Sequence, residues 1–128
     1  MRLEPYVYKV VSVDKVVDGD TFYLTVDLGF HVYHRIKVRL QGVDAPEIFR
    51  PVNEAEKKAG LAARDFVERW LKQGRLIIKT YKDRTGKYGR YLADVYREGE
   101  DESLSHALKA HLEKYHLTKE EIRAQSGS

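Results

Sequence analysis

The sequence predicts an α+β fold, mainly β, in which five strands form a Greek-key barrel with a helix between strands 3 and 4 and one or two C-terminal helices. Three observations lead to this prediction. Three strand-like segments follow one another with short turns, a stripe of apolar residues at helical spacing comes next, and two further strands precede a second helical segment. At 128 residues, the chain is expected to form a single domain over residues 1–128, with a core over about 6–116.

Residues 6–17 and 21–26 are expected to form the first two strands. The first segment is rich in Val and Tyr, and an Asp-Gly pair after it is a typical turn signal. The second segment places every other residue on one face. Its apolar face carries Phe22, Leu24 and Val26. Because the connection between them is short, the two strands begin a meander.

The third strand, predicted over residues 31–40, has the clearest alternation in the chain. Three apolar residues alternate there with Arg35, Lys37 and Arg39. One face should therefore pack on the core, and the other should present three positive charges.

A helix is predicted over residues 53–72, between strands 3 and 4. Asn53 is suited to cap its N-terminus, and Gly74 is suited to end it. Apolar residues recur along it with a period of 3.6 residues. They are Ala55, Ala59, Ala62, Ala63, Phe66, Val67, Trp70 and Leu71.

Two more strands are predicted over residues 75–81 and 91–96. They are separated by residues 82–90, which are polar, contain glycine and are expected to form a loop. A second helix follows over about 103–115, where apolar residues again share one side.

The C-terminal residues give weaker signals. The Thr-Lys-Glu-Glu stretch from residue 118 is suited to cap a short third helix. Residues 124–128 are expected to be frayed or to be the remnant of a tag. The whole order, three strands, a helix, two strands and a helix, is that of an OB-fold, a five-stranded barrel that binds oligonucleotides.

Composition excludes several classes of function. The chain has no cysteine, which excludes disulfides, thiolate catalysis and cysteine-ligated zinc. No apolar run approaches the roughly 20 residues of a membrane-spanning helix, so no membrane partner is expected. The N-terminus lacks the apolar stretch of a secretory signal, so we expect a cytoplasmic protein, or a secreted one whose leader has been removed.

The net charge of +3 is unevenly distributed. Over residues 75–90, six basic residues stand against one acid, Asp83. A charge run of this kind is often only a solvated surface. Together with the basic face of the third strand, however, it favours a polyanionic partner.

Four short motifs supply three carboxylates and two arginines near the ends of predicted strands. Carboxylates can hold a hard cation, a further carboxylate can handle a water, and guanidiniums can clamp a phosphate, so the set is suited to cutting a phosphodiester. Taken singly, each motif can also be a hairpin turn, a surface strand or a polar loop. The motifs are Val-Asp-Gly-Asp-Thr at 17–21, Val-Arg-Leu at 38–40, Val-Asp-Ala-Pro-Glu at 43–47 and Lys-Tyr-Gly-Arg at 87–90.

In their order and separation, these motifs resemble the thermonuclease family, the staphylococcal-nuclease-like domains. The resemblance covers roughly residues 7–108. It rests on residues 17–21, on Val-Arg-Leu-Gln-Gly-Val-Asp-Ala-Pro-Glu at 38–47, and on Asp-Arg-Thr-Gly-Lys-Tyr-Gly-Arg-Tyr-Leu-Ala at 83–93. The family fold is the OB barrel expected from the element order. One ordered match assigns all five charged groups to a single site, which argues against reading each motif as structural.

The resemblance also implies a role for each matching residue. Asp20 and Asp44 fall at the two calcium carboxylates, and Ala45 falls where a backbone carbonyl joins the calcium ligands. Glu47 matches the general base. The residues matching phosphate contacts are Arg39 and Arg90 on the scissile phosphate, and Lys87 and Tyr88 on a neighbouring one. Residue types alone would also allow magnesium, so the preference for calcium comes from the family.

The function implied is a calcium-dependent phosphodiesterase, an endo- and exonuclease, that hydrolyses DNA and RNA with low sequence specificity and leaves 3′-phosphates. We expect a monomer that prefers single strands. The alternative is a catalytically silent OB-fold module that binds single-stranded nucleic acid. A protein-docking domain is a weaker reading, because it leaves the charged groups unexplained.

Overall fold

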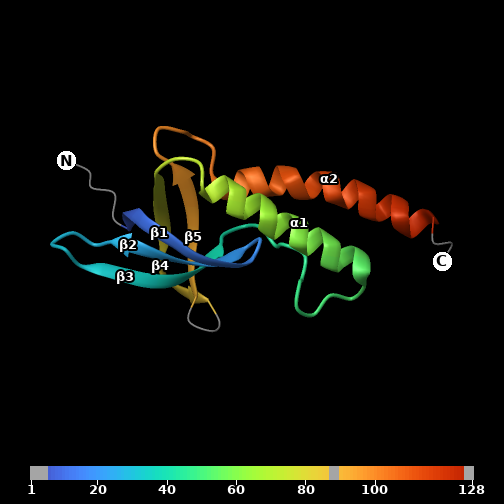
Figure 1. The fold of residues 1–128 in the computed structure, drawn as a ribbon, viewed down its shortest axis with the longest axis horizontal. Coiled ribbons are helices and arrows are strands. Elements are labelled where there is room, and N and C mark those ends of the chain that lie inside the picture. Colours follow the sequence, from blue (N-terminus) through green and yellow to red (C-terminus); the bar gives the residue numbers. More distant parts are fainter. Residues whose placement is uncertain (1–5, 87–89, 126–128) are drawn as a thin grey trace.

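A computed structural model of the chain describes residues 6–86 and 90–125, which form a closed five-stranded barrel and two helices (Figure 1). The barrel order is β1-β2-β3-β5-β4, and every strand pair is antiparallel except β3–β5. The mainly β, OB-type barrel predicted from the sequence is therefore confirmed. In chain order the elements are β1 (Val7–Asp18), β2 (Thr21–Asp27), β3 (Tyr33–Leu40), α1 (Glu54–Leu71), β4 (Leu76–Gly86), β5 (Arg90–Arg97) and α2 (Leu104–Gln125).

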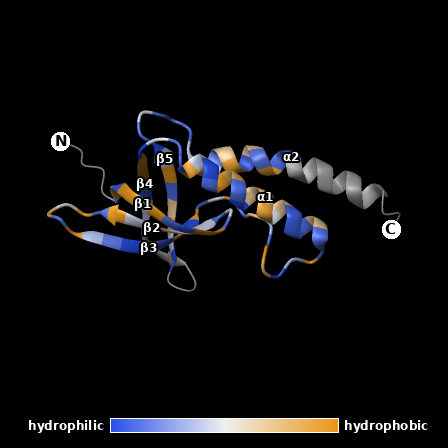
Figure 2. Cartoon of the chain, viewed as in Figure 1, coloured by the Kyte–Doolittle hydropathy of each residue, from blue (hydrophilic) through white to orange (hydrophobic). Residues whose placement is uncertain are grey.

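The barrel interior is filled by the apolar residues that alternate along the strands. Phe22 and Leu24 of β2 and Val38 of β3 are completely buried, as is Leu108 of α2. Burying a side chain of this size contributes about 1.5–3 kcal/mol. Figure 2 shows hydrophilic and hydrophobic positions mixed along each strand and along α1, as expected for elements with one buried face.

The helices lie side by side and extend away from the barrel (Figure 1). Asn53 caps α1 as predicted, because its side chain accepts a hydrogen bond of 2.8 Å from the Glu56 amide. The apolar stripe predicted for α1 supplies Ala63, Val67 and Trp70 to the core. This packing fixes α1 against the barrel and against the loop that precedes it.

The C-terminal half differs from the prediction in two places. β4 continues to Gly86 instead of ending near residue 81, since its last residues pair with β5, Thr85 with Tyr91 and Gly86 with Arg90. α2 is one continuous helix to Gln125, with no break at Thr118. Of the residues expected to be frayed, 124–125 end this helix and 126–128 lie outside the described residues. No helix in the described part of the chain is long and apolar enough to span a bilayer.

Candidate functional site

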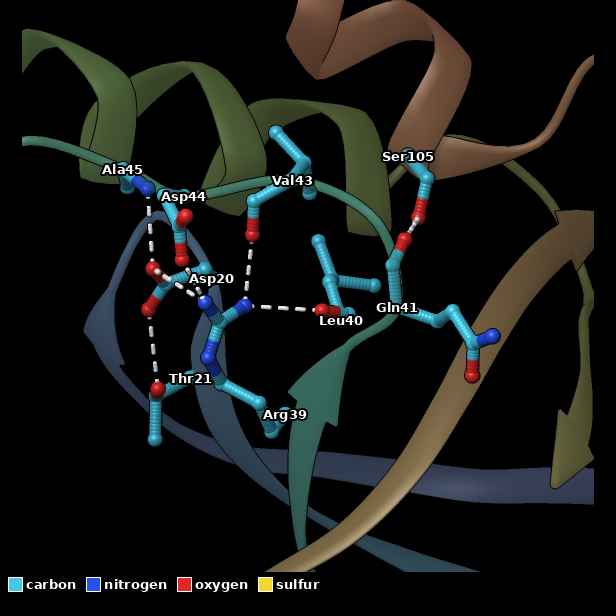
Figure 3. Close-up of polar contacts among 9 residues, drawn as sticks. All are labelled: Asp20, Thr21, Arg39, Leu40, Gln41, Val43, Asp44, Ala45 and Ser105. Atoms are coloured by element: carbon cyan, nitrogen blue, oxygen red, sulfur yellow. Dashed lines mark hydrogen bonds and ion pairs between the residues drawn. The ribbon is translucent and has the colours of Figure 1, made fainter. Parts of the chain in front are cut away.

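Three segments meet at one end of the barrel: the β1–β2 turn, the last residues of β3 and the loop from β3 to α1. The Leu40 amide donates a hydrogen bond of 2.8 Å to the Asp20 carbonyl, which joins the end of β3 to the turn. Arg39 lies directly across the β2–β3 ladder from Thr21. Neighbouring residues of three motifs that are separate in the sequence therefore share one small region (Figure 3).

Asp20 is a buried carboxylate with both oxygens engaged (Figure 3). Its Oδ1 accepts a hydrogen bond of 2.9 Å from the Thr21 hydroxyl, and its Oδ2 accepts one of 2.8 Å from the Ala45 amide. The second bond links the β1–β2 turn to the β3–α1 loop. Burying a carboxylate without hydrogen bonds would destabilise the fold. These two bonds offset that cost and hold the Asp20 side chain in place.

Arg39 is held by the backbone on one side and by carboxylates on the other (Figure 3). Its Nη1 donates to the carbonyls of Leu40 at 2.7 Å and Val43 at 2.6 Å. Its Nη2 donates to Asp44 and lies 3.6 Å from Asp20 Oδ2. The guanidinium is thus oriented by groups that do not depend on a ligand. Because the Asp44 side chain is 92% exposed, it can turn into solvent and release an Arg39 donor.

Asp18 is a further acidic group of this region, for which the sequence alone predicts only a turn. Burial raises the pKa of its carboxyl, and the negative charges of Asp20 and Glu47 raise it further. Its Oδ1 is buried and accepts no hydrogen bond from the described residues. What could have identified Asp18 from the sequence is that it is a second carboxylate in the same motif, two residues before Asp20.

Glu47 is exposed on the β3–α1 loop and lies close enough to Asp18 to affect its ionisation. The loop rests directly on α1 at Gly60. A Cβ atom at that position would lie only 2.8 Å from the Pro46 carbonyl oxygen and 3.1 Å from that of Glu47. Contact between the loop backbone and a glycine of α1 therefore determines where the Glu47 backbone lies.

Of the remaining predicted site residues, the structure describes Arg90. Arg90 is the first residue of β5 and is half-buried. β5 runs parallel to β3, with Val38 beside Tyr91 and Arg39 beside Leu92, so Arg90 is on the strand next to Arg39. Lys87 and Tyr88 lie outside the described residues.

The residues predicted to hold calcium agree with a hard cation in ligand type. Asp20 and Asp44 offer carboxylate oxygens, and both face the same positive group, Arg39 Nη2. Ala45 lies beside them, its amide bound to Asp20. Among the described residues, no group of three or more His, Cys, Asp or Glu side chains is placed to hold a metal by itself. Any cation here would need backbone, water and substrate oxygens to complete its ligands.

The sequence is similar to nucleases of known families. Residues 37–121 match the staphylococcal nuclease homologue family. The chain is 36% identical over 96 residues to the thermonuclease of Staphylococcus intermedius, covering 75% of this chain and 51% of that protein. It is 35% identical over 91 residues to the endonuclease YhcR of Bacillus subtilis, covering 67% of this chain and 7% of that protein. It is 37% identical over 110 residues to an uncharacterized protein of Methanocaldococcus jannaschii, covering 73% of this chain and 49% of that protein.

Proposed function

Because this chain belongs to the staphylococcal nuclease family, we propose that it is a calcium-dependent phosphodiesterase that cleaves DNA and RNA with low sequence specificity and leaves 3′-phosphates. The chain spans about half the length of the thermonuclease it matches. The observation that supports the proposal most strongly is the fixed Arg39 guanidinium with the Asp20 and Asp44 carboxylates beside it.

Arg39 is proposed to bind the scissile phosphate. A guanidinium donates paired N–H groups to phosphate oxygens, which a lysine ammonium cannot do. Its orientation is set in advance by the Leu40 and Val43 carbonyls, so little ordering is needed when charge develops in the transition state. Arg90, on the neighbouring strand, is proposed as the second arginine of this clamp.

The carboxylates divide into a cation-holding pair and a base. Asp20, Asp44 and the Ala45 carbonyl would hold calcium, which when bound supplies positive charge to the phosphate and orients the attacking water. Glu47 is proposed to take the proton from that water. Its exposed side chain leaves it accessible, and Pro46 before it stiffens the loop. Lys87 and Tyr88 are proposed to contact a neighbouring phosphate.

A silent nucleic-acid-binding module is the alternative, and the distribution of acids argues against it. Asp18, Asp20, Asp44 and Glu47 lie at the same end of the barrel as Arg39. On a surface that only bound a polyanion, four acids would weaken the binding by charge repulsion. Two of them, Asp18 and Asp20, are at the β1–β2 turn. Acids are useful at a phosphate site when a cation offsets their charge and one of them acts as a base.

The experiment that tests the proposal is cleavage of denatured DNA by the purified protein, with calcium and then with excess EGTA. Calcium-dependent digestion, lost in Glu47→Gln while oligonucleotide binding persists, is the expected result. Glu47→Asp, which retains a carboxylate, is the matched control and should keep part of the activity. Salt-sensitive retention of DNA with no digestion under either condition would identify the binding module instead.

A further inference from the structure

A row of side chains leads away from Arg39 along the outer face of β3. We call Tyr33, Arg35 and Lys37 the β3 row. Their neighbours Ile36 and Val38 point into the core, so the row faces outward. Alternate residues of a strand are about 7 Å apart, which gives evenly spaced groups that end at Arg39.

Tyr23 of β2 holds the two basic members of the row in place. It lies directly across the ladder from Lys37. The Arg35 Cζ atom is 4.8 Å from the centre of the Tyr23 ring, and the Lys37 Nζ atom is 5.5 Å from it. Cation–π contacts of this kind orient long side chains that would otherwise sample many rotamers. Tyr23 therefore presents two cations as one local patch.

Two acids lie beside the row and neutralise only part of its charge. Asp27, across the ladder from Tyr33, accepts a hydrogen bond of 2.7 Å from the Gly29 amide. Asp14 lies 3.6 Å from the Arg35 Nε, and it already accepts hydrogen bonds of 2.8 Å from the hydroxyls of Ser12 and Thr25. These hydroxyls lower the pKa of Asp14 and share its charge. The Arg35 side chain remains 59% exposed, so its guanidinium stays accessible to an anion from outside.

The far end of the row is aromatic. Tyr33, at the start of β3, is 55% exposed. An exposed ring at the end of a row of two cations is suited to stacking under a base while the cations bind the phosphates that follow along the strand. Such a combination fits a single strand better than a duplex, whose bases are stacked on one another.

We propose that the β3 row is an extended subsite for single-stranded nucleic acid, with phosphates on Arg35 and Lys37 and a base on Tyr33. It binds the part of the strand that lies beyond the phosphate at Arg39. This rests on the proposed nuclease function and adds to it a footprint: short oligonucleotides use the site at Arg39 alone, and longer ones also use β3.

The test compares two charge reversals that change the net charge equally. Arg35→Glu/Lys37→Glu alters the row, and Lys57→Glu/Lys58→Glu alters two exposed cations of α1, outside the barrel. Binding of fluorescein-labelled oligothymidylates of about 4 and about 16 nucleotides is measured by anisotropy with EGTA, in a Glu47→Gln background. For the row variant, we expect a roughly tenfold weaker Kd for the long probe, an unchanged Kd for the short one, and a salt-dependence slope lower by about 1.4. The α1 variant should bind both probes like its parent.

Milder variants keep the test valid if the charge reversal unfolds the protein. Arg35→Gln/Lys37→Gln should also weaken binding of the long probe, by a smaller factor than the charge reversal. Tyr33→Ala should also weaken it, and Tyr33→Phe, which retains the ring, should restore it. Tyr23→Leu should weaken binding of the long probe, because Tyr23 positions Arg35 and Lys37. Tyr23→Phe, which retains the ring, should restore that binding.

The outcomes distinguish this proposal from the one on which it rests. If the row and α1 variants bind the long probe equally well, the β3 row is not a subsite, while calcium-dependent cleavage would leave the nuclease proposal intact. If the parent protein neither binds nor cuts either probe, both proposals are wrong.

Discussion

The β1–β2 turn and the β3–α1 loop each bring an aspartate to the same arginine, but in opposite surroundings. Asp20 in the turn is buried and accepts hydrogen bonds from Thr21 and Ala45. Asp44 in the loop has a side chain that is 92% exposed and contacts Arg39. The comparison teaches that one carboxylate is part of the fold, whereas the other is an adjustable group, so stability and activity should respond differently to their loss.

Arg39→Ala removes the group that both regions share and should have the largest effect. Losing one transition-state donor costs about 3–4 kcal/mol, or on the order of a hundred- to a thousandfold in kcat/KM on denatured DNA. Arg39→Lys keeps the charge but not the paired donors, so it should recover only a small part of the rate. Activity of Arg39→Lys equal to that of the parent would show that the arginine supplies charge alone.

Asp20→Ala and Asp44→Ala form a matched pair that tests the comparison directly. Asp20→Ala leaves the buried Ala45 amide without its acceptor and should lower the free energy of unfolding by about 1–3 kcal/mol. Asp44→Ala should change it by less than about 0.5 kcal/mol, because the side chain is exposed. Urea unfolding measures both values, and both variants should lose cleavage. Equal destabilisation would contradict the additional structural role that is assigned to Asp20 and not to Asp44.

Gly60→Ala tests whether α1 positions the loop. In a helix, this change alone would stabilise by about 1 kcal/mol. Here the new Cβ would lie 2.8 Å from the Pro46 carbonyl oxygen, so the loop must shift. We expect net destabilisation of about 1 kcal/mol in urea unfolding, with reduced kcat, and no such change for Lys57→Ala on the exposed side of α1. A gain in stability with full activity would show that the loop does not depend on this contact.

The smallest effect is expected at the contact between the two helices, away from both regions. His111 of α2 stacks on Phe66 of α1, with ring centres 4.7 Å apart. Burial lowers the pKa of His111 below its usual 6.5, and the charge of Arg69 lowers it further. As the pH falls through 6.5, the unfolded chain takes up the proton first, so stability is lost on acidification. His111→Phe should reduce the loss of thermal stability between pH 7 and pH 5, with activity at pH 7 unchanged. If parent and variant lose the same thermal stability between pH 7 and pH 5, groups other than His111 cause the loss.

The elements predicted correctly are those with strong local patterns. The alternation in β2 and β3 and the period of α1 identify their buried faces from near neighbours in the chain. The predicted end of β4 at residue 81 was wrong. The polar residues after it are typical of a loop, and they form a strand only because they pair with β5. The expected break at Thr118 was wrong as well: the Lys and Glu residues after it are good helix formers, so the capping signal is not used and α2 continues.

The sequence by itself determined which groups this end of the barrel offers: carboxylates, an arginine on the outer face of β3 and a glutamate after a proline. Tertiary structure decided which of them are buried and paired. The bond from Ala45 to Asp20 joins residues 25 apart in the chain. Asp18 became an acid with a raised pKa because the fold buries its carboxyl and brings the charges of Asp20 and Glu47 near it. Gly19 beside it packs against Ala45 and Ala63, where a Cβ would lie 3.0 Å from each methyl group. Burial and ionisation depend on segments that meet only in the folded chain, and local sequence patterns carry no information about that meeting.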